Sequence, residues 1–516
     1  MLSDSRIQYF LKTSYKDLKE GEYKELVEEY FQKPKSNSKW IEIEENKGSK
    51  KEKWISSKLK EFWKLIRKHT MTKGNLEQIF YFNNFIFPDF EFIEEGSFDL
   101  FPSFWEKDKK RVFNANTYFS DAKFLGFFPF FGVDFKGVVS FNRASFLGFS
   151  NFQQANFFGN ANFNSTNFYE DVSFINVKFF KRVSFYQSKF YKGSSFLNSN
   201  FYRLAKFDEV EFLKSVNFSR VSFSDDASFL EVHFSSLADF SATNFLNIAN
   251  FQFSQFSGQT IFIHNKFLKG GEFSFCRFSN QEETLFQDPV IPKRRGLRLD
   301  NINFTNKVIM RGVSFYGATF FQSDITEIKF KNCNWNELKG RILLVEEDNI
   351  IRKPFKDLEE LYRQLKKNFE GSKDWELAGK AYVSEMEMRR KRFKMEFFEN
   401  LKTFRLRKLS TLFGALSNYL IFNTYSLLGG YTQSYNRPLF AFLLLFFVSV
   451  YVYSDCFSLN YYCQCSFLPW KNSIDASLPF FKASNVGHIK WFYFQKISST
   501  ILLTFFILAL RKRFKQ

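Results

Sequence analysis

Residues 155–190 read ANFFGNANFNSTNFYEDVSFINVKFFKRVSFYQSKF, and this stretch decides the fold. Phenylalanine recurs at Phe157, Phe163 and Phe168, in alternating steps of six and five residues, and the same steps continue without a gap over residues 113–278. A helical period of about 3.6 residues and a strand period of about two both fail to fit these steps. The pattern therefore indicates a solenoid in which each step forms one side of a coil.

The residues between successive phenylalanines indicate which side chains form the core. A small or β-branched residue lies two positions before nearly every Phe, as in Ala155-Asn156-Phe157, and the residue between is mostly polar. We expect the Phe and the small residue to point inward, with successive coils about 4.8 Å apart. The predicted core rings are Phe157, Phe163, Phe168, Phe174, Phe179, Phe185, Phe190, Phe196, Phe201, Phe207, Phe212, Phe218, Phe223 and Phe229.

These triplets resemble the repeats of pentapeptide-repeat proteins, in a variant with Phe at the centre. The resemblance covers residues from about 113 to 335, and the chain departs from the plain period of five by alternating five and six. It implies a mainly β fold, a right-handed, roughly four-sided β-helix with four repeats per coil. We place this β-helix at residues 111–340.

The series of phenylalanines at steps of five and six, which we call the Phe ladder, stops after Phe278 and resumes at Phe304. The residues between them contain two prolines and a basic cluster, Lys293, Arg294, Arg295 and Arg298. We predict an excursion loop at 279–303 with the basic cluster in solvent. Contact of the cluster with nucleic acid or anionic lipid is the alternative.

We predict that residues 1–110 form a mixed, helical cap on the N-terminal end of the solenoid. Helical spacing occurs at 14–31 and 54–69, with a predicted loop at 46–53 and a first irregular β layer at 85–92. A solenoid needs its open first coil covered, because exposed strand edges pair with other chains. A partner-binding module is the alternative for this region.

After residue 340 the pattern becomes helical. Residues 341–408 predict a helical hairpin with a basic stretch, in which Gly371 ends the first helix and Asp374 caps the second. We interpret Glu385 and Glu387 as surface ion-pair partners of the arginines that follow. The hairpin resembles a segment that follows the repeats in many bacterial membrane-associated pentapeptide-repeat proteins.

Residues 409–516 predict a membrane region with two transmembrane helices, at about 438–454 and 493–510. The segment 409–428 contains asparagines and fits an interfacial helix better than a span. Neither span shows a polar stripe. The closing segment resembles that of the same bacterial group, which implies the inner membrane of a bacterium.

The distribution of basic residues predicts the orientation of the spans. Basic residues crowd before the first span and after the second, whereas the loop 455–490 has only Lys471, Lys482 and Lys490. The positive-inside rule then places both termini in the cytoplasm and the loop outside. Disulfides form there, and we expect Cys456 to pair with Cys463 or Cys465.

The sequence shows no catalytic, cofactor-binding or metal-binding constellation. It lacks a phosphate-binding loop, a dinucleotide fingerprint, a nucleophile elbow and a zinc-protease motif. Its four histidines are scattered, and the adjacent carboxylates Glu170 and Asp171 are poor acid–base partners. We expect no enzyme activity and no cofactor.

Three functions remain, and the first is a membrane-anchored scaffold whose cytoplasmic β-helix binds a protein partner. A small channel or transporter is the second. The third is a mimic of duplex DNA that binds topoisomerases, as the resemblance implies for some members of the family. Such a mimic requires an acidic surface. Residues 111–280 carry sixteen Lys and Arg against twelve Asp and Glu, which disfavours this function. The net charge of the chain is +19. The expected partners are the lipid bilayer and a cytoplasmic protein, with no nucleic acid, and a homo-oligomer stays open.

Overall fold

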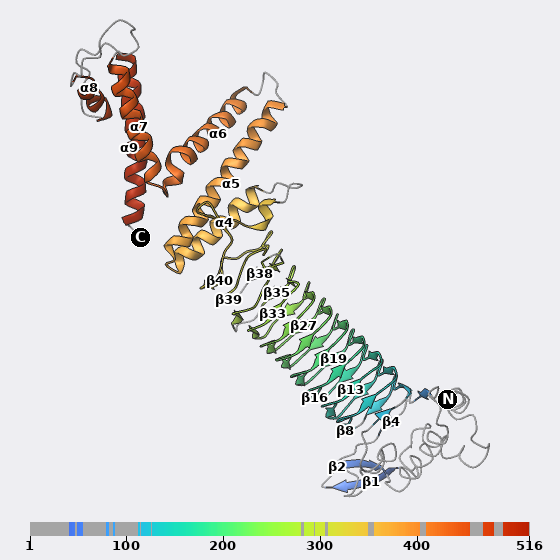
Figure 1. Cartoon of the computed structure of the whole chain (residues 1–516). Coiled ribbons are helices and arrows are strands. Elements are labelled where there is room, and N and C mark those ends of the chain that lie inside the picture. Colours follow the sequence, from blue (N-terminus) through green and yellow to red (C-terminus); the bar gives the residue numbers. More distant parts are fainter. Residues whose placement is uncertain are drawn as a thin grey trace. The chain divides into compact units, whose positions relative to one another are not determined.

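The computed structural model divides into two compact units, Met1–Trp335 and Asn336–Gln516, which are described separately (Figure 1). The residues that the structure describes are 41–46, 49–54, 79–81, 86–87, 112–113, 115–124, 126–279, 283–293, 295–304, 308–348, 355–402, 409–454, 468–478 and 489–514.

An antiparallel hairpin of β1 (Ile41–Asn46) and β2 (Ser49–Trp54) lies in the N-terminal region. It replaces the loop predicted at 46–53. In its register Glu44 is opposite Lys51 and Glu42 is opposite Lys53. The helix predicted at 14–31, and all but the first residue of the one predicted at 54–69, lie outside the described residues.

The first unit is a β-solenoid of parallel sheets, as the Phe ladder predicts (Figure 1). One coil contains β14 (Ala161–Asn162), β15 (Asn167–Phe168), β16 (Val172–Ser173) and β17 (Lys178–Phe179). Each strand pairs with one in the next coil, in order β18 (Val183–Ser184), β19 (Lys189–Phe190), β20 (Ser194–Ser195) and β21 (Asn200–Phe201). The strands therefore form four sheets, which we call sheets 1 to 4 in the order of this coil.

Sheets 1, 2 and 3 have ten strands each and sheet 4 has eight. Sheet 1 runs from β3 (Ile79–Tyr81) to β37 (Leu297–Arg298), and sheet 2 from β4 (Ile86–Phe87) to β38 (Asn303–Phe304). Sheet 3 runs from β8 (Phe128–Pro129) to β40 (Ile328–Lys331), and sheet 4 from β5 (Val112–Phe113) to β33 (Lys266–Phe267). The solenoid thus begins before residue 111, with β3 and β4.

The Phe rings fill the solenoid in columns. Every predicted core ring from Phe157 to Phe229 is at most 1% exposed. Within a column the rings stack face to face, as Phe163 does on Phe185, with centroids 4.8 Å apart and planes at 7°. Between columns the rings meet edge to face, as Phe163 does with Phe174, at 5.5 Å and 87°. Both are favoured aromatic geometries.

The alternation of five and six residues produces two kinds of corner. At a five-residue step, Thr166 N–H donates to the Phe163 carbonyl at 3.2 Å and Ser165 has φ of 54°, which are features of a type II turn. At the six-residue step from Phe168 to Phe174, no residue has a positive φ. We call the five-residue steps tight corners and the six-residue steps wide corners. Each coil contains two of each, and the two of one kind lie opposite each other.

The predicted excursion loop at 279–303 is instead a continuation of the coil. β36 (Thr284–Gln287) pairs with β32 (Thr260–Ile263) on one side and β39 (Val308–Arg311) on the other. Phe286 stacks on Phe262 at 4.8 Å, and Phe304 on Phe278 at 5.5 Å. Extra residues at the wide corners move the inward positions along the sequence, so the steps of five and six no longer reveal them.

The second unit begins with a short hairpin of β41 (Glu337–Leu338) and β42 (Arg341–Ile342), followed by a 3₁₀ turn, η3 (Val345–Asp348). Its helices are α4 (Phe355–Gly371), α5 (Trp375–Lys402), α6 (Leu409–Gly429), α7 (Asn436–Tyr453), α8 (Leu468–Ser477) and α9 (Ile489–Phe514), with η5 (Gly430–Thr432) between α6 and α7.

The turn between α4 and α5 has the helix end and the helix cap that the sequence predicts. Helix α4 ends at Gly371, and Asp374 Oδ1 accepts the Leu377 N–H at 3.1 Å to cap α5. Helix α8 lies inside the region treated as a loop in the sequence. It carries Pro469 in its first turn, where a missing N–H costs little.

Candidate functional site

A buried cluster of ion pairs holds the hairpin α4–α5 to the segment before it. The Glu347 side chain is 2% exposed and accepts hydrogen bonds from Arg341 at 2.6 and 2.9 Å, from Lys391 at 3.1 Å and from the Tyr362 hydroxyl at 2.5 Å. The same hydroxyl accepts the Leu344 N–H at 2.9 Å. Burial, with Glu347 beside it, raises the pKa of Tyr362 well above its usual value. The phenol thus stays protonated and donates to the carboxylate.

Further carboxylates bind the basic stretch of α5. Glu359 pairs with Arg389 at 2.8 Å and Arg392 at 3.1 Å, and Glu385 pairs with Arg389 at 3.2 Å. Glu359 and Glu385 are buried. The ion pairs predicted for Glu385 therefore form, but the carboxylate lies in the interior instead of on the surface.

Glu387 connects α5 to η5. Arg390 donates to it from two nitrogens, at 2.6 and 3.1 Å, and the Tyr431 hydroxyl donates at 3.0 Å. Burial by itself would raise the pKa of Glu387, but the hydrogen bonds from Arg390 and Tyr431 outweigh it and hold the pKa below its usual value. The carboxylate is therefore ionised, and it fixes η5, which leads into α7.

Among the described helices, α7 and α9 are long and apolar enough to cross a membrane, over Asn436–Tyr453 and Ile489–Arg511. Large apolar side chains project outward from both, including Phe440, which is 70% exposed, and Ile497, which is 63% exposed. These are the two segments in which the sequence predicts spans. Exposed apolar helix surfaces of this kind favour a lipid environment.

A line of polar contacts joins these helices to α8, contrary to the expectation that neither span has a polar stripe. Gln495 is fully buried, accepts the Tyr453 hydroxyl at 3.0 Å, and donates to Ser473 Oγ at 2.9 Å and Ser477 Oγ at 3.0 Å. One turn away, Trp491 Nε1 donates to Ser449 Oγ at 3.1 Å. The four-residue spacing of 449 with 453 and of 491 with 495 is the signal in the sequence that reveals this stripe.

The wide corners of the solenoid carry apolar side chains on the outside. At one wide corner, Phe158, Phe180 and Tyr202 stack with centroids 4.7 and 5.0 Å apart, and Lys136 Nζ lies 3.5 Å from the Phe158 centroid. Ser224 occupies this position in the next coil, and Leu246 and Leu268 occupy it in the two coils after that, since their amides bond to Phe223 and Phe245 in the same register. Tyr202, Leu246 and Leu268 are 38–40% exposed. We call these five apolar residues the Phe158 stripe.

The opposite wide corner carries a second stripe. Tyr169 stacks on Tyr191 at 4.7 Å, with Leu147 before them and Leu213 after them at the same position of the coil. We call these four residues the Tyr169 stripe. Part of each stripe could be found in the sequence as aromatic doublets 22 residues apart, such as Phe157-Phe158 with Phe179-Phe180 and Phe168-Tyr169 with Phe190-Tyr191.

The comparisons with known proteins agree with this repeat. A family model described as pentapeptide repeats, in nine copies, matches residues 130–177, 152–199 and 196–244, all within the regular coils. The solenoid is a pentapeptide-repeat domain. No curated protein and no solved structure matches the chain significantly.

The other titratable groups that the sequence analysis singles out lie at separate places in the pentapeptide-repeat domain. Among the described residues, no three His, Cys, Asp or Glu side chains gather where they could hold a metal ion. Glu170 and Asp171 are exposed at a wide corner, and His233 is half-buried with its ring 3.4 Å from Ser257 Oγ. Cys456, Cys463 and Cys465, for which we predicted a disulfide, lie outside the described residues.

The two cysteines of the pentapeptide-repeat domain take small-residue positions of the ladder. Cys276 is buried and its Sγ donates to the Phe251 carbonyl at 2.8 Å, as Thr166 Oγ1 does to the Phe141 carbonyl. Burial raises the pKa of Cys276 far above its usual value, and that of Cys333 to about 11. Both thiols therefore stay protonated and unreactive at neutral pH.

Proposed function

We propose that the chain is a membrane-anchored scaffold that presents its pentapeptide-repeat domain to a cytoplasmic protein partner and acts by binding. The observation that carries this proposal is the Phe158 stripe. Tyr202, Leu246 and Leu268 are exposed and Phe158 and Phe180 are half-buried, although the fold needs only the rings inside the solenoid. The stacked rings of Phe158, Phe180 and Tyr202 form a contiguous apolar surface, which Ser224 separates from Leu246 and Leu268. Contiguous apolar surface is a recognised feature of protein interaction sites.

The helical unit supports the membrane part of the proposal. Helices α7 and α9 would cross the inner membrane of a bacterium, with Arg437 in the first turn of α7 and Arg511 in the last turn of α9 on the cytoplasmic side. The pentapeptide-repeat domain and both termini would then lie in the cytoplasm. The helix α6 has no charged residue, and Leu420, Ile421 and Leu427 are exposed on it, which fits a helix at the interface.

The alternative of a channel receives no support from the polar groups of the helical unit. Within the described residues, Gln495 bonds to Tyr453, Ser473 and Ser477, so these groups satisfy one another. Such contacts stabilise helix packing in a bilayer. They do not line an open path.

A site-specific photo-crosslinker tests the scaffold in living cells. We expect the full chain with the crosslinker at Phe180 to form one discrete adduct, and the adduct to disappear when Phe158 and Tyr202 are both changed to Ser. A crosslinker at Ser195, on the polar face of sheet 3, is the matched control and should give no adduct. Equal adducts at both positions, or none at Phe180, would contradict the proposal.

Membrane fractionation tests the anchor independently. We expect the chain to stay in the membrane pellet after alkaline carbonate extraction, because two spans are not released by high pH. Recovery of the full chain in the supernatant would reject the anchor, and it would leave the result of the crosslinking experiment unaffected.

A further inference from the structure

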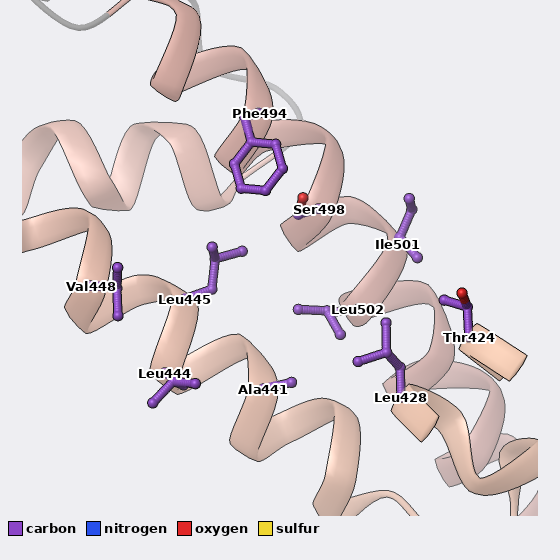
Figure 2. A pocket seen from close by; sticks show the side chains of 10 residues that line it. All are labelled: Thr424, Leu428, Ala441, Leu444, Leu445, Val448, Phe494, Ser498, Ile501 and Leu502. Atoms are coloured by element: carbon purple, nitrogen blue, oxygen red, sulfur yellow. The ribbon is translucent and has the colours of Figure 1, made fainter. Parts of the chain in front are cut away.

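Helices α6, α7 and α9 line a cavity of about 430 Å³ (Figure 2). This volume lies within the range of about 300–1,000 Å³ that is usual for small-molecule sites. Leu428 of α6, Ala441 and Leu445 of α7 and Leu502 of α9 are among the apolar side chains that line it. Seven of the ten lining residues are aliphatic and Phe494 adds an aromatic ring, so the lining suits a hydrocarbon chain.

Two hydroxyls interrupt the aliphatic lining, Thr424 of α6 and Ser498 of α9 (Figure 2). The neighbouring hydroxyls of α9 bond to carbonyls one turn back, as Thr500 does to Lys496 and Thr504 to Thr500, both at 2.8 Å. In the part of the chain that the structure describes, Thr424 and Ser498 make no such bond. Each can therefore donate to an ester or carbonyl oxygen of a bound molecule.

A cation lies one helical turn from a residue that lines the cavity. Arg437 is one helical turn before Ala441, on the same face of α7, and its Nη1 donates to the Ser426 carbonyl of α6 at 3.2 Å. The Arg437 side chain is exposed and keeps further donors for a ligand. The sequence contains no Asp or Glu from residue 401 to residue 454, so no nearby carboxylate of these helices competes for the guanidinium.

We propose that this cavity binds an anionic phospholipid, with an acyl chain along the aliphatic lining and the phosphate group at Arg437. The inference rests on the proposed function, because a lipid reaches the cavity only if α7 and α9 cross the bilayer. Guanidinium–phosphate pairs are strong and can be bidentate. The chemistry is therefore that of a lipid which combines a negative headgroup with a long hydrocarbon.

Native mass spectrometry of the full chain tests the site. The protein is purified in detergent, stripped of lipid and titrated with phosphatidylglycerol or with phosphatidylcholine of the same acyl chains. We expect about tenfold tighter binding of phosphatidylglycerol. The preference should vanish in Arg437→Gln, which removes the charge and leaves the cavity intact.

A second pair of variants separates the cavity from the surrounding surface. Ala441→Phe fills the cavity and should reduce the occupancy of both lipids severalfold. Leu443→Phe adds the same ring on α7 at an exposed position away from the cavity and should leave binding unchanged. A monodisperse elution profile shows that each variant is folded.

The outcomes distinguish this site from the membrane anchor. If the chain is released by carbonate extraction, the proposed function and this inference both fail. If it stays in the membrane but Ala441→Phe binds lipid as well as Leu443→Phe does, the cavity is not the site and the inference alone is overturned. Equal binding of both lipids by the unmodified chain would reject the role of Arg437.

Discussion

The pentapeptide-repeat domain and the helical unit are stabilised by opposite kinds of contact. In the solenoid the same ring stacks on the same ring in every coil, and the buried hydroxyls between the rings, such as those of Thr166 and Ser188, bond to backbone carbonyls. In the helical unit, buried carboxylates such as Glu347 and Glu359 are held by arginine and lysine side chains. The solenoid therefore depends on shape and repetition, and the helical unit on a few individual charges. We therefore expect the solenoid to be most sensitive to the loss of a buried ring, and the helical unit to the loss of a buried charge.

The largest effect should come from a ring inside the solenoid. Phe207 is fully buried, stacks on Phe185 and Phe229 at 4.9 Å, and meets Phe196 and Phe218 edge to face. We expect Phe207→Ala to lower the free energy of unfolding by about 3–5 kcal/mol, since it leaves a cavity in a packed column. Urea unfolding of the full chain in detergent, with hydrogen exchange of this coil, measures the loss.

The neighbouring residue provides the control. The Lys206 side chain is 42% exposed, and its partner Asp208, at 3.3 Å, is buried and also accepts hydrogen bonds from Ser228 Oγ and the Leu230 N–H, which remain when Lys206 is removed. Lys206→Ala should therefore change the unfolding free energy by less than about 1 kcal/mol. Similar losses at both positions would show that the inward and outward assignments are wrong.

In the helical unit the corresponding weak point is a charge. Glu347→Gln leaves Arg341 and Lys391 without their buried carboxylate, and we expect a loss of about 3 kcal/mol. Glu376, paired with Lys380 but 78% exposed, provides the matched control, and Glu376→Gln should have no measurable effect. Thermal unfolding of the two variants compares them directly. Equal melting temperatures would mean that the buried cluster does not stabilise the unit.

The two regions should also respond to pH with opposite sign. Glu387 in the helical unit has its pKa held below the usual value, so its contribution to stability is lost as pH falls below about 4.5. Burial raises the pKa of Glu272 in the solenoid, against the opposing effect of Arg298. The folded state therefore holds this proton more tightly than the unfolded state, and the free energy of unfolding falls as pH rises above about 4.5. Glu387→Gln and Glu272→Gln should therefore change the pH profile of the unfolding free energy in opposite directions, which unfolding curves between pH 3 and 7 can test. A shift in the same direction for both would contradict the assignment.

This difference explains what could be predicted from the sequence. The solenoid was visible because every coil repeats the same inward Phe, from Phe113 to Phe278. The coil at 279–303 was missed because extra residues at its corners move the inward positions to Phe286 and Leu299. Repetition thus reveals a fold only as long as the step stays constant.

The contacts of the helical unit were harder to predict, because they join residues far apart in the sequence. Glu347 and Lys391 are separated by 44 positions, and no local spacing relates them. The capping residue Asp374 was predictable, since its partner Leu377 lies within one turn. The cavity of α6, α7 and α9 depends on the packing of three helices and had no signal in the sequence.

The smallest effect that we predict concerns the two kinds of corner, which the steps of five and six indicate but do not explain. Ser165 lies at a tight corner with φ of 54°, a conformation that β-branched residues adopt at a cost, so Ser165→Val should lose about 1 kcal/mol. Asn160, exposed at a wide corner without a positive φ, provides the control, and Asn160→Val should lose almost nothing. Urea unfolding midpoints of the two variants measure the difference. If the two valines cost the same, the left-handed turn is not what sets the five-residue step, and the alternation must arise from the packing of the rings alone.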